Sequence, residues 1–180
     1  PPYFLAVGNI KPHKNIRLLC RAFAHIAEIC EASLVLAGEY AGFRNAETST
    51  DTLAAICPGR IRFTGAVEQA ELVRLMYGAT ALIFPSRYEG FGLPPLEALA
   101  AGIPVIASDI PPVREVCSEH AQYFSPDSEE ELAQVMLETL ALAVQERQQR
   151  SGAGRAHARN FSWAKAAETT AQVLRKTLKG

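Results

Sequence analysis

Short apolar runs alternate with longer stretches of helical periodicity along the whole chain. Short, mostly apolar runs predict strands over residues 3–7, 34–37, 61–64, 81–84, 105–107 and 121–124. Between these runs, apolar residues recur every three or four positions, as at Leu72, Leu75, Met76 and Ala79, which is the spacing of one helical face. This spacing, together with capping signals, predicts helices over about 14–30, 72–79, 94–101, 112–117, 128–147 and 163–178, and one that ends near residue 57.

The order of these elements predicts an α/β fold. The apolar runs lack a strict alternation of apolar and polar residues, which is typical of strands buried on both faces of a sheet. Strands that alternate with helices predict right-handed crossovers and a Rossmann-like, doubly wound parallel sheet with helices on both faces. A length of 180 residues predicts one domain. Ligands of such sheets bind beyond the carboxyl ends of the strands, so we expect functional residues in the loops at 8–15, 38–45, 65–67, 85–93 and 108–112.

Composition and charge narrow the class of protein. With 18 basic and 19 acidic residues, the chain has a formal net charge of −1 and no field of one sign that would attract nucleic acid. No apolar run approaches the roughly 20 residues needed to span a bilayer. The four cysteines, at positions 20, 30, 57 and 117, lack zinc or redox spacing and are expected to be small buried or half-buried thiols in a reducing compartment. No Asp-x-Asp cluster or His/Cys ligand set is present, so we predict no metal and no cofactor.

The densest glycine and proline punctuation lies in residues 88–95, Tyr-Glu-Gly-Phe-Gly-Leu-Pro-Pro, between a predicted strand and a predicted helix. Free N–H groups of a glycine loop and of the first turn of a helix form an anion site with the helix dipole. Gly90 and Gly92 would let backbone amides approach a ligand closely. Glu89 precedes these glycines, and Glu97 is expected in the first turn of the helix. Carboxylates accept hydrogen bonds from paired sugar hydroxyls, although one at a helix N-terminus is also stabilised by the helix dipole alone.

The segment from Glu89 to Glu97 resembles the E-x7-E motif of the glycosyltransferase group 1 family, and residues 98–107 continue the resemblance. Members of this family are retaining enzymes with the GT-B architecture of two Rossmann-like domains. The resemblance implies that the first glutamate lies by the donor sugar, that loop amides bind sugar hydroxyls and phosphate, and that the second glutamate holds the ribose. The residues that inherit these roles are Glu89, Gly90, Phe91, Gly92, Leu93 and Glu97.

Residues 7–16 resemble the first loop of the same family, in which a glycine is followed by a basic pair, commonly Arg then Lys, that neutralises the donor diphosphate. Gly8 matches the glycine and Lys14 the lysine, so Lys14 joins Glu89 as the second residue implied to act in the reaction. Asn9 stands where many members have arginine, and Lys11 and His13 are both candidates to compensate.

Smaller matches complete the resemblance. The loops after the second and third predicted strands are implied to lie near the nucleotide base, as are two residues before the glycine loop. These base-proximal candidates are Gly38, Tyr40, Gly65, Val67, Arg87 and Tyr88. Residues 161–163, Phe-Ser-Trp, resemble the C-terminal segment of the family, and Trp163 is expected to pack against the domain.

The resemblance implies transfer of a hexosyl group, with mannose favoured, from a GDP- or UDP-linked sugar to a glycan or lipid-linked acceptor. Residues 1–180 would be the C-terminal, donor-binding domain, inactive without an N-terminal acceptor domain, in a cytoplasmic protein peripheral to the inner membrane. Two alternatives remain: a GT-B nucleotide-sugar epimerase and a non-catalytic nucleotide-sugar-binding domain. A dinucleotide oxidoreductase is disfavoured because its G-x-G-x-x-G turn is replaced by a turn with the single glycine Gly8.

Overall fold

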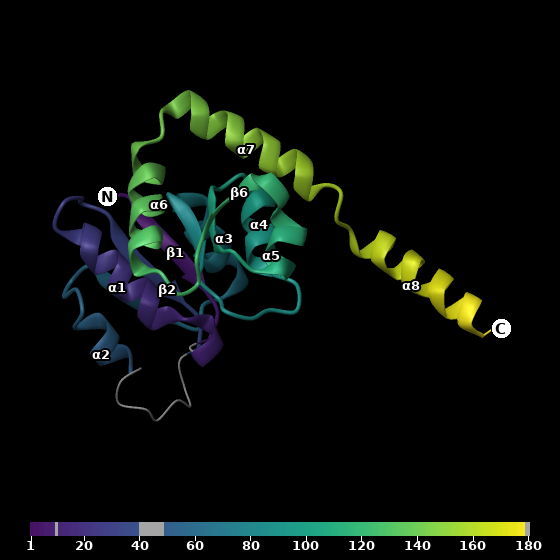
Figure 1. The fold of residues 1–180 in the computed structure, drawn as a ribbon, viewed down its shortest axis with the longest axis horizontal. Helices are drawn as coiled ribbons and strands as arrows, with labels where there is room; N and C mark the ends of the chain where they lie inside the picture. The colour runs from purple at the N-terminus through teal and green to yellow at the C-terminus, as the bar shows by residue number, and fades with distance from the viewer. Residues whose placement is uncertain (10, 40–48, 179–180) are drawn as a thin grey trace.

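A computed structural model describes residues 1–9, 11–39 and 49–178 of the chain (Figure 1). Its described residues form a six-stranded, fully parallel sheet of order β3-β2-β1-β4-β5-β6. The strands are β1 (Tyr3–Val7), β2 (Ser33–Ala37), β3 (Ile61–Gly65), β4 (Ala81–Phe84), β5 (Val105–Ser108) and β6 (Ala121–Phe124). The prediction of a doubly wound parallel sheet is therefore confirmed, and each strand lies within one residue of its expected bounds.

Helices cover both faces of this sheet. They are α1 (Ile16–Ala27), α2 (Thr50–Ala54), α3 (Gln69–Gly78), α4 (Leu93–Ala101), α5 (Pro111–Cys117), α6 (Glu129–Ala141), α7 (Val144–Ala158) and α8 (Trp163–Thr177), with 3-10 turns η1 (Pro12–Lys14) and η3 (Ser118–His120). Alternate strand residues enter two separate cores. Phe4 packs with α1, α2 and α6, whereas its neighbour Leu5 packs with α3, α4 and α5. Burial on both faces explains the continuous apolar runs of the four central strands, β2, β1, β4 and β5.

The sheet reverses its winding between β1 and β4, which are neighbours although they are distant in sequence. From β1 the chain winds outward through β2 and β3, and then returns to add β4, β5 and β6 on the other side. The connections that leave β1 and β4 therefore diverge, and this is where ligands of doubly wound sheets bind. Both loops singled out in the sequence, at 8–15 and 85–93, begin at this point.

One predicted helix is wrong. We expected a single helix over about 128–147, but α6 ends at Ala141 and α7 begins at Val144. The backbone of Leu142 and Ala143 is extended, with ψ of 128° and 149°. The break lets α6 pack against α1 on one face of the sheet and α7 against α4 on the other. The continuation to Ala158 was missed because Gly154 and Ala158 are the only buried residues of α7, so its sequence shows no apolar stripe.

The last helix, α8, projects away from the rest of the described chain (Figure 1). None of its residues is buried. The expectation that Trp163 packs against the domain is wrong in this structure, because its side chain is 80% exposed. None of the described helices combines the length and the apolar character that a bilayer-spanning helix needs.

The predicted burial of the cysteines is confirmed. Cys20 and Cys117 are buried, Cys30 and Cys57 are half-buried, and all four are free thiols. Burial raises the pKa of the Cys20 and Cys117 thiols to about 12.

Candidate functional site

Three neighbouring strands each lead into a glycine at the carboxyl edge of the sheet. Gly8 follows β1, Gly38 follows β2 and Gly65 ends β3. The Gly8 N–H donates to the Ala37 carbonyl at 2.9 Å, and the Gly38 N–H donates to the Gly65 carbonyl at 3.0 Å. Gly38 has φ of 151°, and a Cβ atom there would lie 2.2 Å from the Gly8 carbonyl oxygen. Only glycine fits this approach, so two of the predicted loops are held in direct contact.

Lys14 and Glu89 form an ion pair that joins the loops after β1 and β4. The Lys14 Nζ donates to Glu89 Oε1 at 2.6 Å, and the two side chains are only 19% and 14% exposed. The Nζ also lies 5.3 Å from the centroid of the Phe84 ring, at the end of β4. The structure thus brings together the two residues that the resemblance named as active, although 75 positions separate them in sequence.

Backbone geometry sets the position of Lys14. It is the last residue of η1, and Asn15 follows in the left-handed region with φ of 56°, which turns the chain into α1. The Asn15 Nδ2 donates to the Pro126 carbonyl at 2.8 Å. The Arg87 N–H donates to the His13 carbonyl at 2.8 Å, which ties the loop after β1 to the loop after β4. Asn15 was not predicted, although an asparagine directly before an apolar periodic run is a common helix-entry signal.

A small crevice lies between the two loops at the point where the sheet reverses. This switch-point crevice is lined by Gly8, Asn9, Lys14, Phe84 and Ser86, with neighbouring residues of β1 and β4. Asn9 is exposed at its rim, where the family pattern has arginine.

Two serine hydroxyls at the carboxyl edge have no hydrogen-bond partner among the residues that the structure describes. Ser86 follows β4 and lines the switch-point crevice, and Ser108 is the last residue of β5. Both side chains are 0% exposed. A buried hydroxyl without a partner costs ~1–3 kcal/mol, so these positions call for a polar ligand or a bound water. The sequence analysis missed both serines, although each stands where a strand meets the functional edge.

The glycine loop enters α4 differently from the expectation. Gly92, with φ of 104°, is the N-cap residue, and α4 begins at Leu93. Pro94 and Pro95 have no N–H, so the donors at this helix end belong to the loop residues and Leu93 rather than to a full first turn. Gly90 is open to solvent, and the Phe91 side chain is 44% exposed.

Because α4 begins at Leu93, Glu97 lies in its second turn, and its expected place in the first turn is wrong. Glu97 is exposed and lines a groove between α3 and α4, together with Gln69, Leu72 and Tyr77.

The base-proximal candidates differ in their surroundings. Gly38 and Gly65 are in direct contact, and Val67 is half-buried against the core under α3. The Arg87 guanidinium turns to Asp127 at 2.9 Å, and Tyr88 is 74% exposed. Tyr40 lies outside the described residues.

A third ion pair lies beyond the end of β5. Arg114, on α5, donates two hydrogen bonds to Asp109, and its guanidinium lies 4.2 Å from the centroid of the Tyr123 ring. These hydrogen bonds lower the pKa of the Asp109 carboxyl below its ordinary value. The pair fixes the loop at 108–112, and each of the two groups neutralises the charge of the other.

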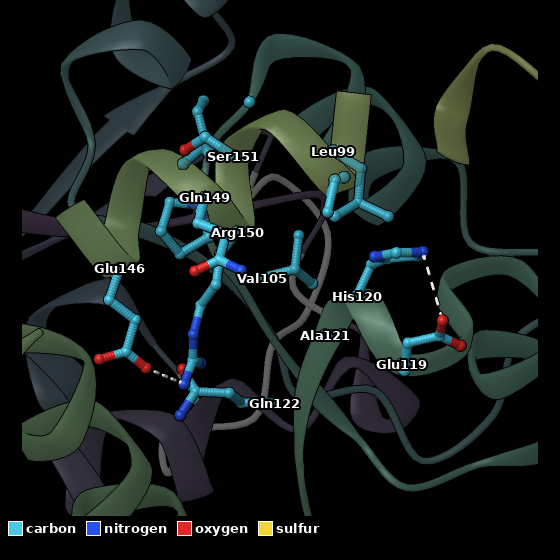
Figure 2. Close-up of a pocket in the computed structure, with 15 residues that line it drawn as sticks. Leu99, Val105, Glu119, His120, Ala121, Gln122, Glu146, Gln149, Arg150 and Ser151 are labelled. Carbon is cyan, nitrogen blue, oxygen red and sulfur yellow. Dashed lines mark hydrogen bonds and ion pairs between the residues drawn. The ribbon is translucent and has the colours of Figure 1, made fainter. Parts of the chain in front are cut away.

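A separate pocket of about 550 Å³ lies at the opposite, amino edge of the sheet (Figure 2). It is bounded by α7 and by the first residues of β5 and β6, and the ion pair between Glu146 and Arg150, at 2.7 Å, borders it. It contains none of the residues singled out by the sequence. Within the described ranges, no three His, Cys, Asp or Glu side chains gather as a metal site would require.

Comparison with known proteins agrees with this geometry. The sequence profile of the family described as Glycosyl transferases group 1 matches residues 1–157. The chain is 31% identical over 163 residues to O-antigen chain mannosyltransferase B of Escherichia coli, covering 89% of this chain and 42% of that protein. It is 37% identical over 130 residues to O-antigen chain mannosyltransferase RfbU of Salmonella typhimurium, covering 71% of this chain and 35% of that protein.

A solved structure shares the fold. Sucrose-phosphate synthase from Thermosynechococcus elongatus aligns with a TM-score of 0.82 at 27% identity, covering 99% of this chain and 46% of the other. The chain therefore spans less than half the length of each of these three proteins. Since the family profile covers most of the chain and curated relatives above 30% identity are glycosyltransferases, the chain belongs to the glycosyl transferases group 1 family.

Proposed function

We propose that this chain is the donor-binding domain of a retaining glycosyltransferase that moves a mannosyl group from a nucleoside diphosphate sugar to a hydroxyl of a glycan or lipid-linked acceptor. The observation that carries the proposal is the ion pair between Lys14 and Glu89, which joins two loops at the switch point of the sheet. The choice of mannose rests on the relatives, two of which are named O-antigen chain mannosyltransferases.

In this proposal, Lys14 binds the diphosphate. An ammonium group has three N–H donors, so Lys14 can keep its bond to Glu89 and still donate to a phosphate oxygen. The buried hydroxyl of Ser86 lines the same crevice and supplies a further polar contact for the ligand or for a water that bridges to it. The amides of Gly90, Phe91 and Gly92 would approach the phosphate or the sugar hydroxyls without interference from a β-carbon at either glycine.

Glu89 and Glu97 take different parts of the donor. Glu89 is held by Lys14 beside the diphosphate site, where its second oxygen can accept from a sugar hydroxyl. Glu97, on the exposed side of α4, would accept from the ribose hydroxyls of a nucleotide that reaches the groove toward α3. Neither glutamate is proposed as a nucleophile.

The proposed chemistry is stabilisation of the leaving group. When the bond from the sugar to the diphosphate breaks, negative charge builds on the phosphate oxygens. A lysine and loop amides that are already oriented in the free protein stabilise that charge without reorganisation, and each such donor is worth ~3 kcal/mol in the transition state. The largely buried ion pair with Glu89 is what would keep Lys14 oriented before the donor arrives.

We further propose that the acceptor is bound by a second domain outside residues 1–180. The chain covers 42% and 35% of the two mannosyltransferase relatives, which leaves room in such proteins for a domain of similar size. Residues 1–180 alone are then expected to bind nucleotide and to transfer little or no sugar.

The test is calorimetric titration of the protein with GDP, UDP, GDP-mannose and UDP-glucose. We expect the protein to bind either the guanosine or the uridine ligands. Lys14→Ala should weaken the affinity for the nucleoside diphosphate about tenfold or more, because a charge-assisted hydrogen bond to the phosphate is lost. Lys165→Ala is the matched control, because Lys165 is an exposed lysine of α8, which projects away from the rest of the described chain. The nucleotide affinity of this variant should change less than about twofold.

Two further results decide the proposal. Glu97→Ala should weaken nucleotide binding while leaving the thermal unfolding midpoint in place. Failure of the wild-type protein to bind any of the four ligands would refute the proposed site. In a protein that also carries the acceptor domain, binding of the sugar donor without release of the nucleoside diphosphate would favour a non-catalytic nucleotide-sugar-binding domain.

A further inference from the structure

Phe91 is the only side chain between the two glycines of the loop, and its ring has a definite partner. It meets the ring of Phe161 edge-on, with centroids 6.2 Å apart and planes at 78°. This is a favoured arrangement of two aromatic rings. Phe161 lies in the connection between α7 and α8, 70 positions further along the chain. Because Gly90 and Gly92 add no side-chain contacts of their own, the Phe91–Phe161 contact is the side-chain contact that ties residues 90–92 to the connection between α7 and α8.

Phe161 itself rests on fixed neighbours. Its N–H donates to the Ala158 carbonyl at 3.1 Å, and its ring meets His157 with centroids 5.5 Å apart. The His157 Nε2 lies 2.7 Å from the Val116 carbonyl oxygen, so this nitrogen carries a hydrogen and donates to α5. The His157 ring also contacts His120, with centroids 4.6 Å apart and planes at 39°, and Figure 2 shows His120 at the amino edge beside Glu119. The row of rings thus runs from that edge to the glycine loop.

We infer that Phe161 is a positioning residue for the glycine loop, acting through Phe91 to hold the loop amides in the conformation that binds the donor. The inference rests on the proposed function for its consequence in binding. It follows that the connection between α7 and α8, which lies outside the motif from Glu89 to Glu97, contributes to the affinity for the donor. An aromatic pair of this geometry is worth about a two- to tenfold change in the equilibrium it stabilises.

The first measurement is hydrogen exchange of the amides of residues 88–93, which needs no ligand. Phe161→Leu should speed exchange in this segment, whereas Phe161→Tyr, which keeps the ring, should not. Trp163→Leu is the matched control, because Trp163 is an exposed aromatic residue two positions away. Unchanged exchange in Phe161→Leu, with the protein folded by circular dichroism, would overturn the inference.

The second measurement is a double-mutant cycle on affinity for the nucleotide sugar. Phe161→Leu and Phe91→Leu should each weaken binding about two- to tenfold, and the double variant should be no weaker than the worse single variant. Additive losses would mean that Phe161 does not act through Phe91, which also overturns the inference. If the wild-type protein binds no nucleotide sugar, the proposed function fails, while the exchange measurement still decides the role of Phe161.

Discussion

The position with the least room at the carboxyl edge is Gly38, where β2 ends. Its left-handed φ and its contact with the Gly8 carbonyl are both incompatible with a side chain. Gly59 offers a contrast, since its φ of 74° is also left-handed but an added Cβ would meet nothing within 4 Å. Of the two, only Gly38 combines backbone strain with a steric overlap.

Gly38→Ala should therefore lower the free energy of unfolding by about 2–4 kcal/mol, because strain and overlap act together. Gly59→Ala should lower it by only about 1–2 kcal/mol, the cost of a left-handed alanine. Urea denaturation followed by circular dichroism measures both. Equal losses would show that the loops after β1 and β2 separate freely, contrary to the close approach described above.

Sequence resemblance identified Lys14 and Glu89 one at a time, each from its own motif. Their contact was beyond the sequence, since it depends on β1 and β4 being neighbours in the sheet. The same holds for Phe91 and Phe161, and for Arg87, whose partner Asp127 lies in a different loop. A local motif identifies single residues, whereas contacts between residues distant in sequence depend on the order of the strands in the sheet.

At the scale of the element, α7 is held by small residues rather than by an apolar stripe. Gly154 is buried against Leu99 of α4, and an added Cβ would lie 3.0 Å from the Leu99 Cδ2 atom. Gly152, one half-turn away on the same helix, has nothing within 4 Å of an added Cβ.

Substitution of these two glycines by alanine should have different effects on stability. Gly152→Ala should raise the free energy of unfolding by about 0.5–1 kcal/mol, since alanine favours a helix over glycine. Gly154→Ala brings the same gain in helix propensity, but the added methyl group crowds Leu99. The free energy of unfolding of Gly154→Ala should therefore be at least about 1 kcal/mol lower than that of Gly152→Ala. Thermal or urea unfolding of the pair decides this, and an equal rise in both would contradict the close packing of α7 on α4.

Element prediction succeeded where burial leaves an apolar period and failed where it does not. The four central strands were predicted because both of their faces are buried and apolar, and α1 was predicted because Ile16, Leu19 and Phe23 line one face. The join of α6 to α7 carries no glycine or proline, so nothing in the local sequence marks the break at Leu142. The break is imposed by packing, since the two helices must reach opposite faces of the sheet.

At the scale of the whole molecule, the buried thiols make the fold sensitive to alkali. Burial raises the pKa of Cys20 and Cys117 from 9.0 to about 12, and that of Tyr123 from 10.0 to about 12. Each group keeps its proton in the folded protein at a pH where the unfolded chain has lost it. Unfolding then releases protons, so stability is complete below pH 9 and falls as the pH rises toward 12.

Urea unfolding at a series of pH values between 7 and about 11 measures this slope. Cys20→Ala removes one of the titrating groups and should flatten the decline, even though the variant is less stable overall. A slope that is unchanged in Cys20→Ala would show that its thiol does not contribute.

The ion pairs around the carboxyl edge have a consequence for how fast a donor arrives. Lys14, Arg87 and Arg114 are each matched by a carboxylate, at Glu89, Asp127 and Asp109 respectively. With these charges already neutralised in pairs, the three described side chains exert little long-range pull on an anionic ligand. Encounter should then be governed by diffusion and nearly indifferent to ionic strength, and selectivity would arise from how long a ligand stays rather than from how quickly it is captured.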